Sequence, residues 1–111
     1  MRRLTQLGLV VAFLIGARVA MAQGGDAKAG KAVFDKSCVA CHAADGSPKE
    51  AVAKMLKVEI PNLGSKDVQA KSDADLKKVI TEGFEKMKPV KGLSDKDTTN
   101  VIAYLRTLKK P

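Results

Sequence analysis

Cys38-Val39-Ala40-Cys41-His42 is the stretch that decides how the rest of this chain is interpreted. It contains both cysteines and the one histidine of the 111-residue sequence. Placed at random, these three residues would adopt this spacing in about one of six thousand arrangements, and the spacing is that of the covalent haem-attachment motif. We therefore predict that Cys38 and Cys41 bind the two vinyl groups of a haem and that His42 is the proximal iron ligand.

A redox-active CxxC pair and a zinc site are the alternatives for the same residues. Redox CxxC motifs belong to a βαβ pattern, whereas no strand pattern precedes Cys38. A zinc site needs a fourth ligand, and the sequence has no further Cys or His to supply it. Haem attachment is therefore the interpretation that the sequence favours.

The N-terminal segment differs from the remainder in composition. Met1-Arg2-Arg3 is basic, a mostly apolar run follows, and Ala20-Met21-Ala22 has the small-x-small form of a cleavage site. We expect residues 1–22 to be a secretory signal peptide and residues 23–111 to be the mature domain. An uncleaved anchor is the alternative, but the apolar run has 14 residues, fewer than the about 20 that span a bilayer.

Cleavage would change the composition of the chain. Removing 22 residues from 111 leaves 89, and because three arginines and no acid leave, the net charge falls from +8 to +5. The whole sequence has three Phe, one Tyr and no Trp, so its core must be thin. Exported domains of this size usually need a disulfide, a bound metal or another cross-link to stabilise them. Export, scarce aromatics and interspersed acids argue against a nucleic-acid-binding surface.

Helical periodicity is the clearest pattern of the mature chain. Asp26 is expected to cap a first helix in which Gly30, Phe34, Cys38 and Cys41 recur on one face. No alternating strand pattern competes with the helical one. We therefore predict an all-α fold of about four short helices joined by long loops.

Three further helices have recognisable ends. Ser47-Pro48-Lys49-Glu50 combines a capping box with proline at the first helical position, which predicts a short helix to about Val58. Ser72 is expected to cap a third helix that Gly83 ends, and Ser94 to cap the last one. The apolar residues of this last helix form a single stripe, made by Val101, Tyr104, Leu105 and Leu108.

With these elements the sequence resembles the small soluble monohaem c-type cytochromes of class I. The resemblance extends over essentially the whole mature chain. It rests on Gly30 and Phe34, the Cys38–His42 motif, Asp45-Gly46, Pro61-Asn62-Leu63, the loop with Met87, and Val101-Ile102-Ala103-Tyr104-Leu105-Arg106. It implies the class I cytochrome c fold, wrapped around one covalently attached haem c. The first and last helices would cross near the haem, bringing Gly30 and Phe34 against Tyr104-Leu105.

Met87 is the residue that we expect as distal iron ligand. It lies between two lysines in an aperiodic loop at residues 84–92, whereas Met55 lies on the expected apolar face of a helix and should fill the core. In the resembling family the ligand methionine also precedes the last helix, although relatives commonly have proline directly after it and Lys88 intervenes here before Pro89. A lysine ligand and an open distal side are the alternatives.

Pro61 is the expected hydrogen-bond partner of the proximal imidazole. A ligating histidine usually donates its other ring N–H to a carbonyl or carboxylate. In the resembling family the acceptor is the carbonyl of a proline in a Pro-x-Leu loop, which Pro61-Asn62-Leu63 matches. An ordinary turn is the alternative for Pro61.

These residues predict an electron carrier and not an enzyme. A thioether ligand favours ferrous over ferric iron, and a six-coordinate iron has no open site for small molecules. We expect a periplasmic monomer whose single haem alternates between the ferrous and ferric states, without stable membrane insertion after signal cleavage. The alternatives are a haem-bearing subunit of a periplasmic oxidoreductase, a gas-binding or catalytic haem protein with an open distal site, and a thiol oxidoreductase.

Acidic redox proteins are the expected partners. Lysines surround the ligand loop and lie along the second expected helix. They are Lys86, Lys88 and Lys91 at the loop and Lys49, Lys54 and Lys57 on the helix. Such charges would attract an acidic partner protein and increase the rate of encounter. A solvated face without a docking role is the alternative.

Overall fold

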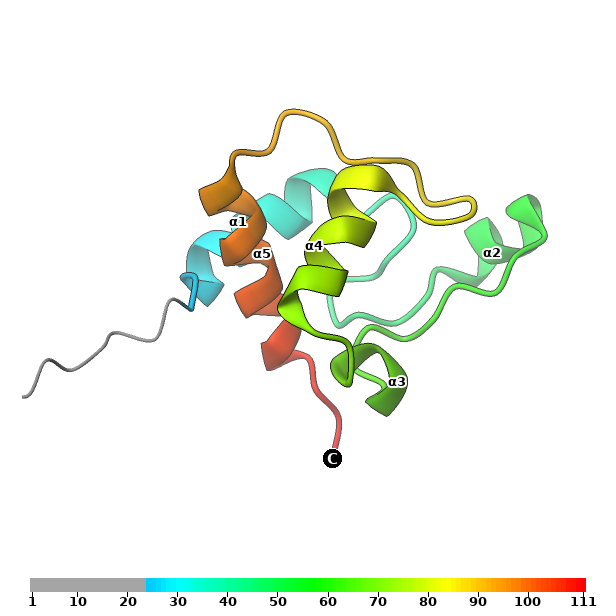
Figure 1. Cartoon of the computed structure of the whole chain (residues 1–111). Helices are drawn as coiled ribbons and strands as arrows, with labels where there is room; N and C mark the ends of the chain where they lie inside the picture. The colour runs from blue at the N-terminus through cyan, green and yellow to red at the C-terminus, as the bar shows by residue number, and fades with distance from the viewer. Residues whose placement is uncertain (1–23) are drawn as a thin grey trace, which may run out of the picture.

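Five α-helices make up the regular structure of residues 24–111, the part of the chain described by the computed structural model (Figure 1). They are α1 (Ala27–Ser37), α2 (Glu50–Leu56), α3 (Lys66–Gln69), α4 (Asp73–Glu82) and α5 (Asp95–Thr107). Within this range there are two isolated β-bridges and no strand, and no helix is both long and apolar enough to cross a membrane. The predicted all-α class is confirmed. The expected signal peptide at residues 1–22 lies outside the described residues.

The crossing of α1 and α5 is the centre of the fold. Asp26 caps α1 as predicted, because its carboxylate accepts hydrogen bonds from the main-chain N–H groups of Lys28 and Ala29 at 2.8 and 3.2 Å. A Cβ added at Gly30 would lie 1.8 Å from the carbonyl oxygen of Asn100 in α5. The two helices therefore approach as closely as they do only because residue 30 has no side chain.

Aromatic packing completes this crossing. Phe34 is fully buried, and its ring centroid lies 5.2 Å from that of Tyr104, with the two ring planes tilted by 59°. Tilted aromatic pairs at this distance are favourable beyond the area that they bury. The expected contact of Phe34 with the last helix at Tyr104 is thus confirmed, whereas Gly30 meets α5 about one turn earlier, at Asn100.

The other predicted serine caps are also present. Ser72 accepts the N–H of Asp75 at 3.1 Å at the start of α4, and α4 ends at Gly83. Ser94 accepts the N–H of Asp97 at 3.0 Å, and the Asp97 carboxylate accepts the N–H of Ser94 at 3.2 Å. This reciprocal pair is a capping box, and it begins α5 where the sequence predicted.

The predicted end of the first helix is wrong. α1 ends at Ser37, Cys38 is its C-cap, and Cys41 lies in the turn that follows. The helix was expected to continue because the apolar period extends through both cysteines. A tight turn keeps the three-residue spacing of the cysteines without a further helical turn.

The predicted start of the second helix is also wrong. Ser47 does not cap it: Lys49 is the N-cap residue, no side chain caps the helix, and α2 ends at Leu56. The cause is a competing main-chain pairing, in which the Ser47 carbonyl accepts the N–H of Ala43 at 2.8 Å. This pairing keeps the chain non-helical through Pro48, so the capping box cannot form.

α2 lies apart from the helix crossing in Figure 1. Ala53 is its one buried residue. Met55 is 72% exposed, so the expectation that it fills the core is wrong. The helical period predicts which residues share a face of α2, but it does not show whether another element covers that face.

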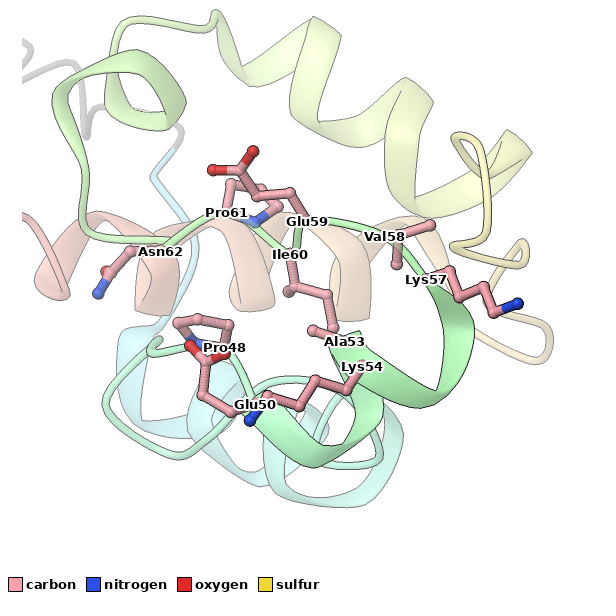
Figure 2. Close-up of a pocket in the computed structure, with 10 residues that line it drawn as sticks. All are labelled: Pro48, Glu50, Ala53, Lys54, Lys57, Val58, Glu59, Ile60, Pro61 and Asn62. Carbon is pink, nitrogen blue, oxygen red and sulfur yellow. The ribbon is translucent and has the colours of Figure 1, made fainter.

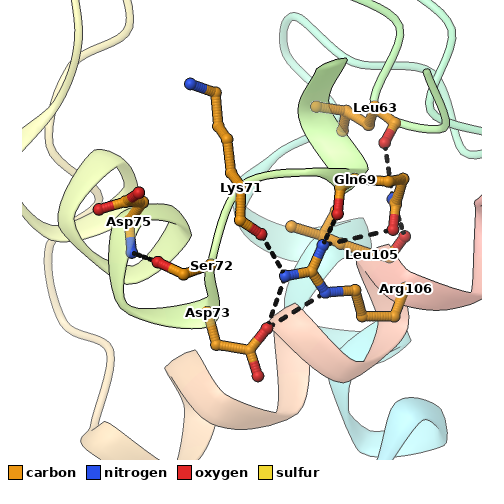
Figure 3. Close-up of polar contacts among 8 residues, drawn as sticks. All are labelled: Leu63, Gln69, Lys71, Ser72, Asp73, Asp75, Leu105 and Arg106. Atoms are coloured by element: carbon orange, nitrogen blue, oxygen red, sulfur yellow. Dashed lines mark hydrogen bonds and ion pairs between the residues drawn. The ribbon is translucent and has the colours of Figure 1, made fainter. Parts of the chain in front are cut away.

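α3 was not predicted, because four residues are too short for a periodic pattern. Its polar contacts link the loop before it to α5 (Figure 3). The Gln69 side-chain amide donates to the Leu63 carbonyl at 2.9 Å and to the Leu105 carbonyl at 2.8 Å. Arg106 of α5 donates to the Gln69 carbonyl at 2.9 Å and to the Asp73 carboxylate at 2.7 Å. The chain after Pro61 is thereby held against the C-terminal half of α5.

Candidate functional site

The two cysteines lie in the turn between α1 and the loop that leads to α2. The N–H groups of Cys41 and His42 both point to the carbonyl of Cys38, at 3.4 and 3.1 Å. Both thiols are free and half-buried. Burial raises the pKa of the Cys38 thiol to about 11, whereas reactive redox cysteines have a lowered pKa. The turn therefore presents two thiols three residues apart, and Cys38 is not activated for thiol exchange.

His42 directly follows the second thiol. Its Nδ1 atom is buried without a hydrogen-bond partner, the one such side-chain atom found in residues 24–111. Burial lowers the pKa of the imidazole, which favours the neutral form that binds metals. A buried polar atom without a partner destabilises a fold, and a ligand or an acceptor at the ring would remove that cost. The turn, its two thiols and this imidazole fit a covalently bound haem.

The segment after His42 returns toward the turn. His42 and Pro48 face each other in an antiparallel bridge, in which the Ala43 N–H donates to the Ser47 carbonyl at 2.8 Å and the Lys49 N–H to the Cys41 carbonyl at 3.1 Å. From α5, the Tyr104 hydroxyl donates to the Ala44 carbonyl at 2.7 Å. The hydrogen bond from Tyr104 thus holds the loop that carries His42 to the helix crossing. It joins residues sixty positions apart, so no local pattern in the sequence indicates it.

Pro61 lies at a cavity of about 720 Å³ beside α2 (Figure 2). Pro48 also lines this cavity, so the cavity borders the segment that pairs with His42. Its volume is in the range of small-molecule and cofactor sites, but neither the two cysteines nor His42 nor Met87 is among its lining residues. Pro61 is exposed, and its carbonyl does not accept a hydrogen bond from His42 Nδ1. Its role as partner of the imidazole stays a prediction.

Met87 lies in a tight turn, where the sequence predicted an irregular loop. Phe84 and Met87 exchange two main-chain hydrogen bonds, at 2.9 and 2.8 Å, and Glu85 has a positive φ of 52°. Glycine is the usual residue at such a position, so the sequence contains no turn signal here. The Met87 side chain is partly buried and packs against the core. Core packing therefore does contribute to the position of Met87, contrary to expectation, and its ligation of iron stays a prediction.

An all-α chain with a helix crossing and a CxxCH turn has the architecture of a small c-type cytochrome. Residues 25–105 match the family described as cytochrome c oxidase, cbb3-type, subunit III, and the chain belongs to this family. It is 36% identical over 90 residues to cytochrome c-554(547) of Halothiobacillus neapolitanus, a match that covers 77% of this chain and 99% of that protein. No solved structure matches the chain.

These comparisons confirm three expectations from the sequence. The chain is a small c-type cytochrome, its cofactor is covalently bound haem c, and its activity is haem-based electron transfer. The assignment of His42 and Met87 as iron ligands stays a prediction.

Proposed function

We propose that this chain is an exported, monomeric one-electron carrier of the periplasm, in which Cys38 and Cys41 form the thioether links and His42 and Met87 bind the iron. The CxxCH turn carries this proposal: two free thiols precede an imidazole with an unpaired buried Nδ1. Haem supplies one-electron redox chemistry at its iron. The chain itself supplies the attachment points and the iron ligands.

Attachment requires no oxidant. Each cysteine S–H would add across one vinyl C=C bond: the S–H bond and the π bond break, one C–S bond and one C–H bond form, and nothing leaves. The turn carries Cys38 and Cys41 three residues apart, and His42 directly follows Cys41. The same local geometry therefore determines both the covalent links and the proximal ligand.

The proposal for the distal side depends on the turn at residues 84–87. The N–H and the carbonyl of Met87 are both hydrogen-bonded to Phe84. These bonds fix the main chain at Met87 and so limit where its thioether can lie. Lys86 and Lys88 on either side of it are exposed, so their charges face water and are available to an acidic partner protein. If His42 and Met87 both bind the iron, it keeps no open site for a small molecule, and we propose that the protein is not an enzyme.

A subunit of a larger oxidoreductase is the second candidate. The family to which the chain belongs is described as a subunit of a cbb3-type oxidase, which favours this candidate. Purification of the native protein in high salt distinguishes the two. A free carrier elutes alone, whereas a subunit elutes with its partner, since large obligate interfaces do not depend on exposed charges.

Spectra of the exported protein test haem attachment. We expect denaturation in acid and organic solvent to leave the haem on the wild-type chain, and the double variant Cys38→Ser/Cys41→Ser to lose it. N-terminal sequencing of the same preparation should begin at Gln23 if the signal is cleaved as predicted. Retention of covalent haem by the double variant contradicts the attachment.

The distal ligand is tested with a matched pair of methionines. The ferric wild-type protein should show the sulfur-to-iron charge-transfer absorption of methionine ligation. We expect Met87→Ala to abolish this band and Met55→Ala to leave it unchanged. A band that survives in Met87→Ala, or disappears in Met55→Ala, shows that the ligand is misassigned.

A further inference from the structure

Lys49 contacts the cysteine-bearing turn at two points. Its main-chain N–H donates to the carbonyl of Cys41 at 3.1 Å. Its side-chain ammonium donates to the carbonyl of Val39, the residue between the two cysteines on the side of Cys38. One residue therefore holds the turn through its main chain and through its side chain.

In the part of the chain that the structure describes, no other residue outside the turn donates a hydrogen bond to these carbonyls. Helix α1 ends at Ser37, so the carbonyls that follow it have no helical partners. Within the turn, the Cys38 carbonyl accepts from Cys41 and His42. Among residues 24–111, the only hydrogen bonds that reach the carbonyls of residues 38–42 from elsewhere come from Lys49.

The position of Lys49 is itself well determined. It is the N-cap residue of α2, and its carbonyl accepts the N–H groups of Val52 and Ala53, both at 3.0 Å. No carboxylate pairs with its ammonium among the ion pairs of residues 24–111. Because the Lys49 ammonium donates to the Val39 carbonyl, its charge lies just beyond the end of α1. The partial negative charge of a helix C-terminus favours a cation there.

We propose that Lys49 is a positioning residue for the haem-attachment turn and that its charge raises the reduction potential of the bound haem. The inference rests on the proposed attachment at Cys38 and Cys41. The ferric state carries one more positive charge than the ferrous state, so a cation held on this turn disfavours oxidation. Lys49 thus has a role inside the molecule, beyond being one lysine of a docking surface.

Lys54 supplies the matched control. It lies in α2, the helix that begins after Lys49, carries the same charge and is exposed, and its side chain makes no hydrogen bond to the turn. Lys49→Met and Lys54→Met therefore remove equal charge from the molecule. Lys49→Arg keeps a cation that can still donate to the Val39 carbonyl.

The experiment is a redox titration of the haem-loaded wild type and these three variants. We expect Lys49→Met to shift the equilibrium toward the ferric form about threefold, which is about 28 mV at 59 mV per factor of ten. Lys54→Met should shift it less than half as far, and Lys49→Arg should stay near the wild type. Equal shifts in Lys49→Met and Lys54→Met would overturn the proposal.

Hydrogen exchange gives a second measurement that does not depend on redox activity. If Lys49 holds the turn, the amides of Cys41 and His42 exchange faster in Lys49→Met than in Lys54→Met. If exchange of these amides is unchanged and Lys49→Met and Lys54→Met have equal potentials, the role of Lys49 is refuted, while the haem attachment is not. Absence of covalent haem in the wild type instead refutes the proposed attachment, so the two failures are distinguishable.

Discussion

The helix crossing of α1 and α5 and the segment at residues 48–62, which contains α2 and lines the cavity, are built in different ways. At the crossing, Phe34 and Val101 are exposed by no more than 1%. In the segment at residues 48–62, Ala53 is the one buried residue and Met55 is 72% exposed. The crossing is stabilised by the protein's own side chains. The α2 segment has no comparable core.

Replacing Gly30 should have the largest effect, because it breaks the crossing itself. A Cβ there would meet the Asn100 carbonyl at 1.8 Å, so Gly30→Val forces α1 away from α5. We expect a loss of about 4–5 kcal/mol of unfolding free energy, enough to reduce the yield of folded protein sharply. Urea unfolding followed by circular dichroism measures it. The control is Ala32→Val on the exposed face of α1, which should cost less than about 1 kcal/mol; similar losses in both variants contradict the close approach.

Replacing two phenylalanines, one in the helix crossing and one in the exposed turn before α5, compares how much each region contributes to stability. Phe34 is fully buried and Phe84 is 63% exposed. We expect Phe34→Ala to lower the unfolding free energy by about 4 kcal/mol, since it leaves a cavity. Phe84→Ala should change it by about 0.5 kcal/mol or less. Denaturant midpoints of the two haem-loaded variants test this, and a large loss for Phe84→Ala would show that the turn has a core of its own.

Arg106 joins α5 to α3 and α4, so replacing it tests how much contacts outside the helix crossing stabilise the fold. Its guanidinium bonds the Gln69 carbonyl and the Asp73 carboxylate, and charged hydrogen bonds of this kind contribute about 2 kcal/mol together. Arg106→Met should lower the unfolding free energy by about that amount. Lys77→Met breaks a more exposed ion pair, with Asp95 at 3.4 Å, and should cost less than about 0.5 kcal/mol. If thermal unfolding shows the two variants to be equally stable, the Arg106 contacts contribute no more than a surface pair.

The smallest effect concerns Asp45, in the loop between the crossing and α2. The Ser47 N–H donates to its carboxylate at 2.9 Å and holds the pKa of Asp45 below its ordinary value of 3.8. Ionised Asp45 therefore stabilises the fold above the unfolded pKa, and this contribution is lost as the pH falls through the lower folded pKa. Carbon NMR of the Asp45 carboxyl should show a midpoint below 3.8. A midpoint at or above that value contradicts the hydrogen bond.

Local signals in the sequence predicted the helices that local contacts define. Asp26, Ser72 and Ser94 cap helices where expected, because a side chain that bonds the next N–H groups acts within four residues. Ser47 has the same local pattern but does not cap α2, because the hydrogen bond from the Ala43 N–H to the Ser47 carbonyl keeps the chain non-helical there. The patterns are equivalent in sequence, and only the neighbouring chain distinguishes them.

The candidate site divides in the same way. The CxxCH spacing identified the thiols and the imidazole, since their function depends on positions that are adjacent in the chain. The contacts that support them come from distant positions: Tyr104 reaches Ala44 across the fold, and Lys49 reaches Val39. The exposure of Met55 could not be predicted either, because burial depends on what packs against a face.

The sequence by itself determined the all-α class, the capped helices and the haem-attachment motif, because these depend on residues within one or two helical turns of each other. Only the tertiary structure decided that α1 ends before the cysteines, that Met87 lies in a tight turn, and that α2 stands apart from the core. The physical reason is the same in each case. Main-chain hydrogen bonds and packing between distant segments compete with local preference, and at these positions they are stronger.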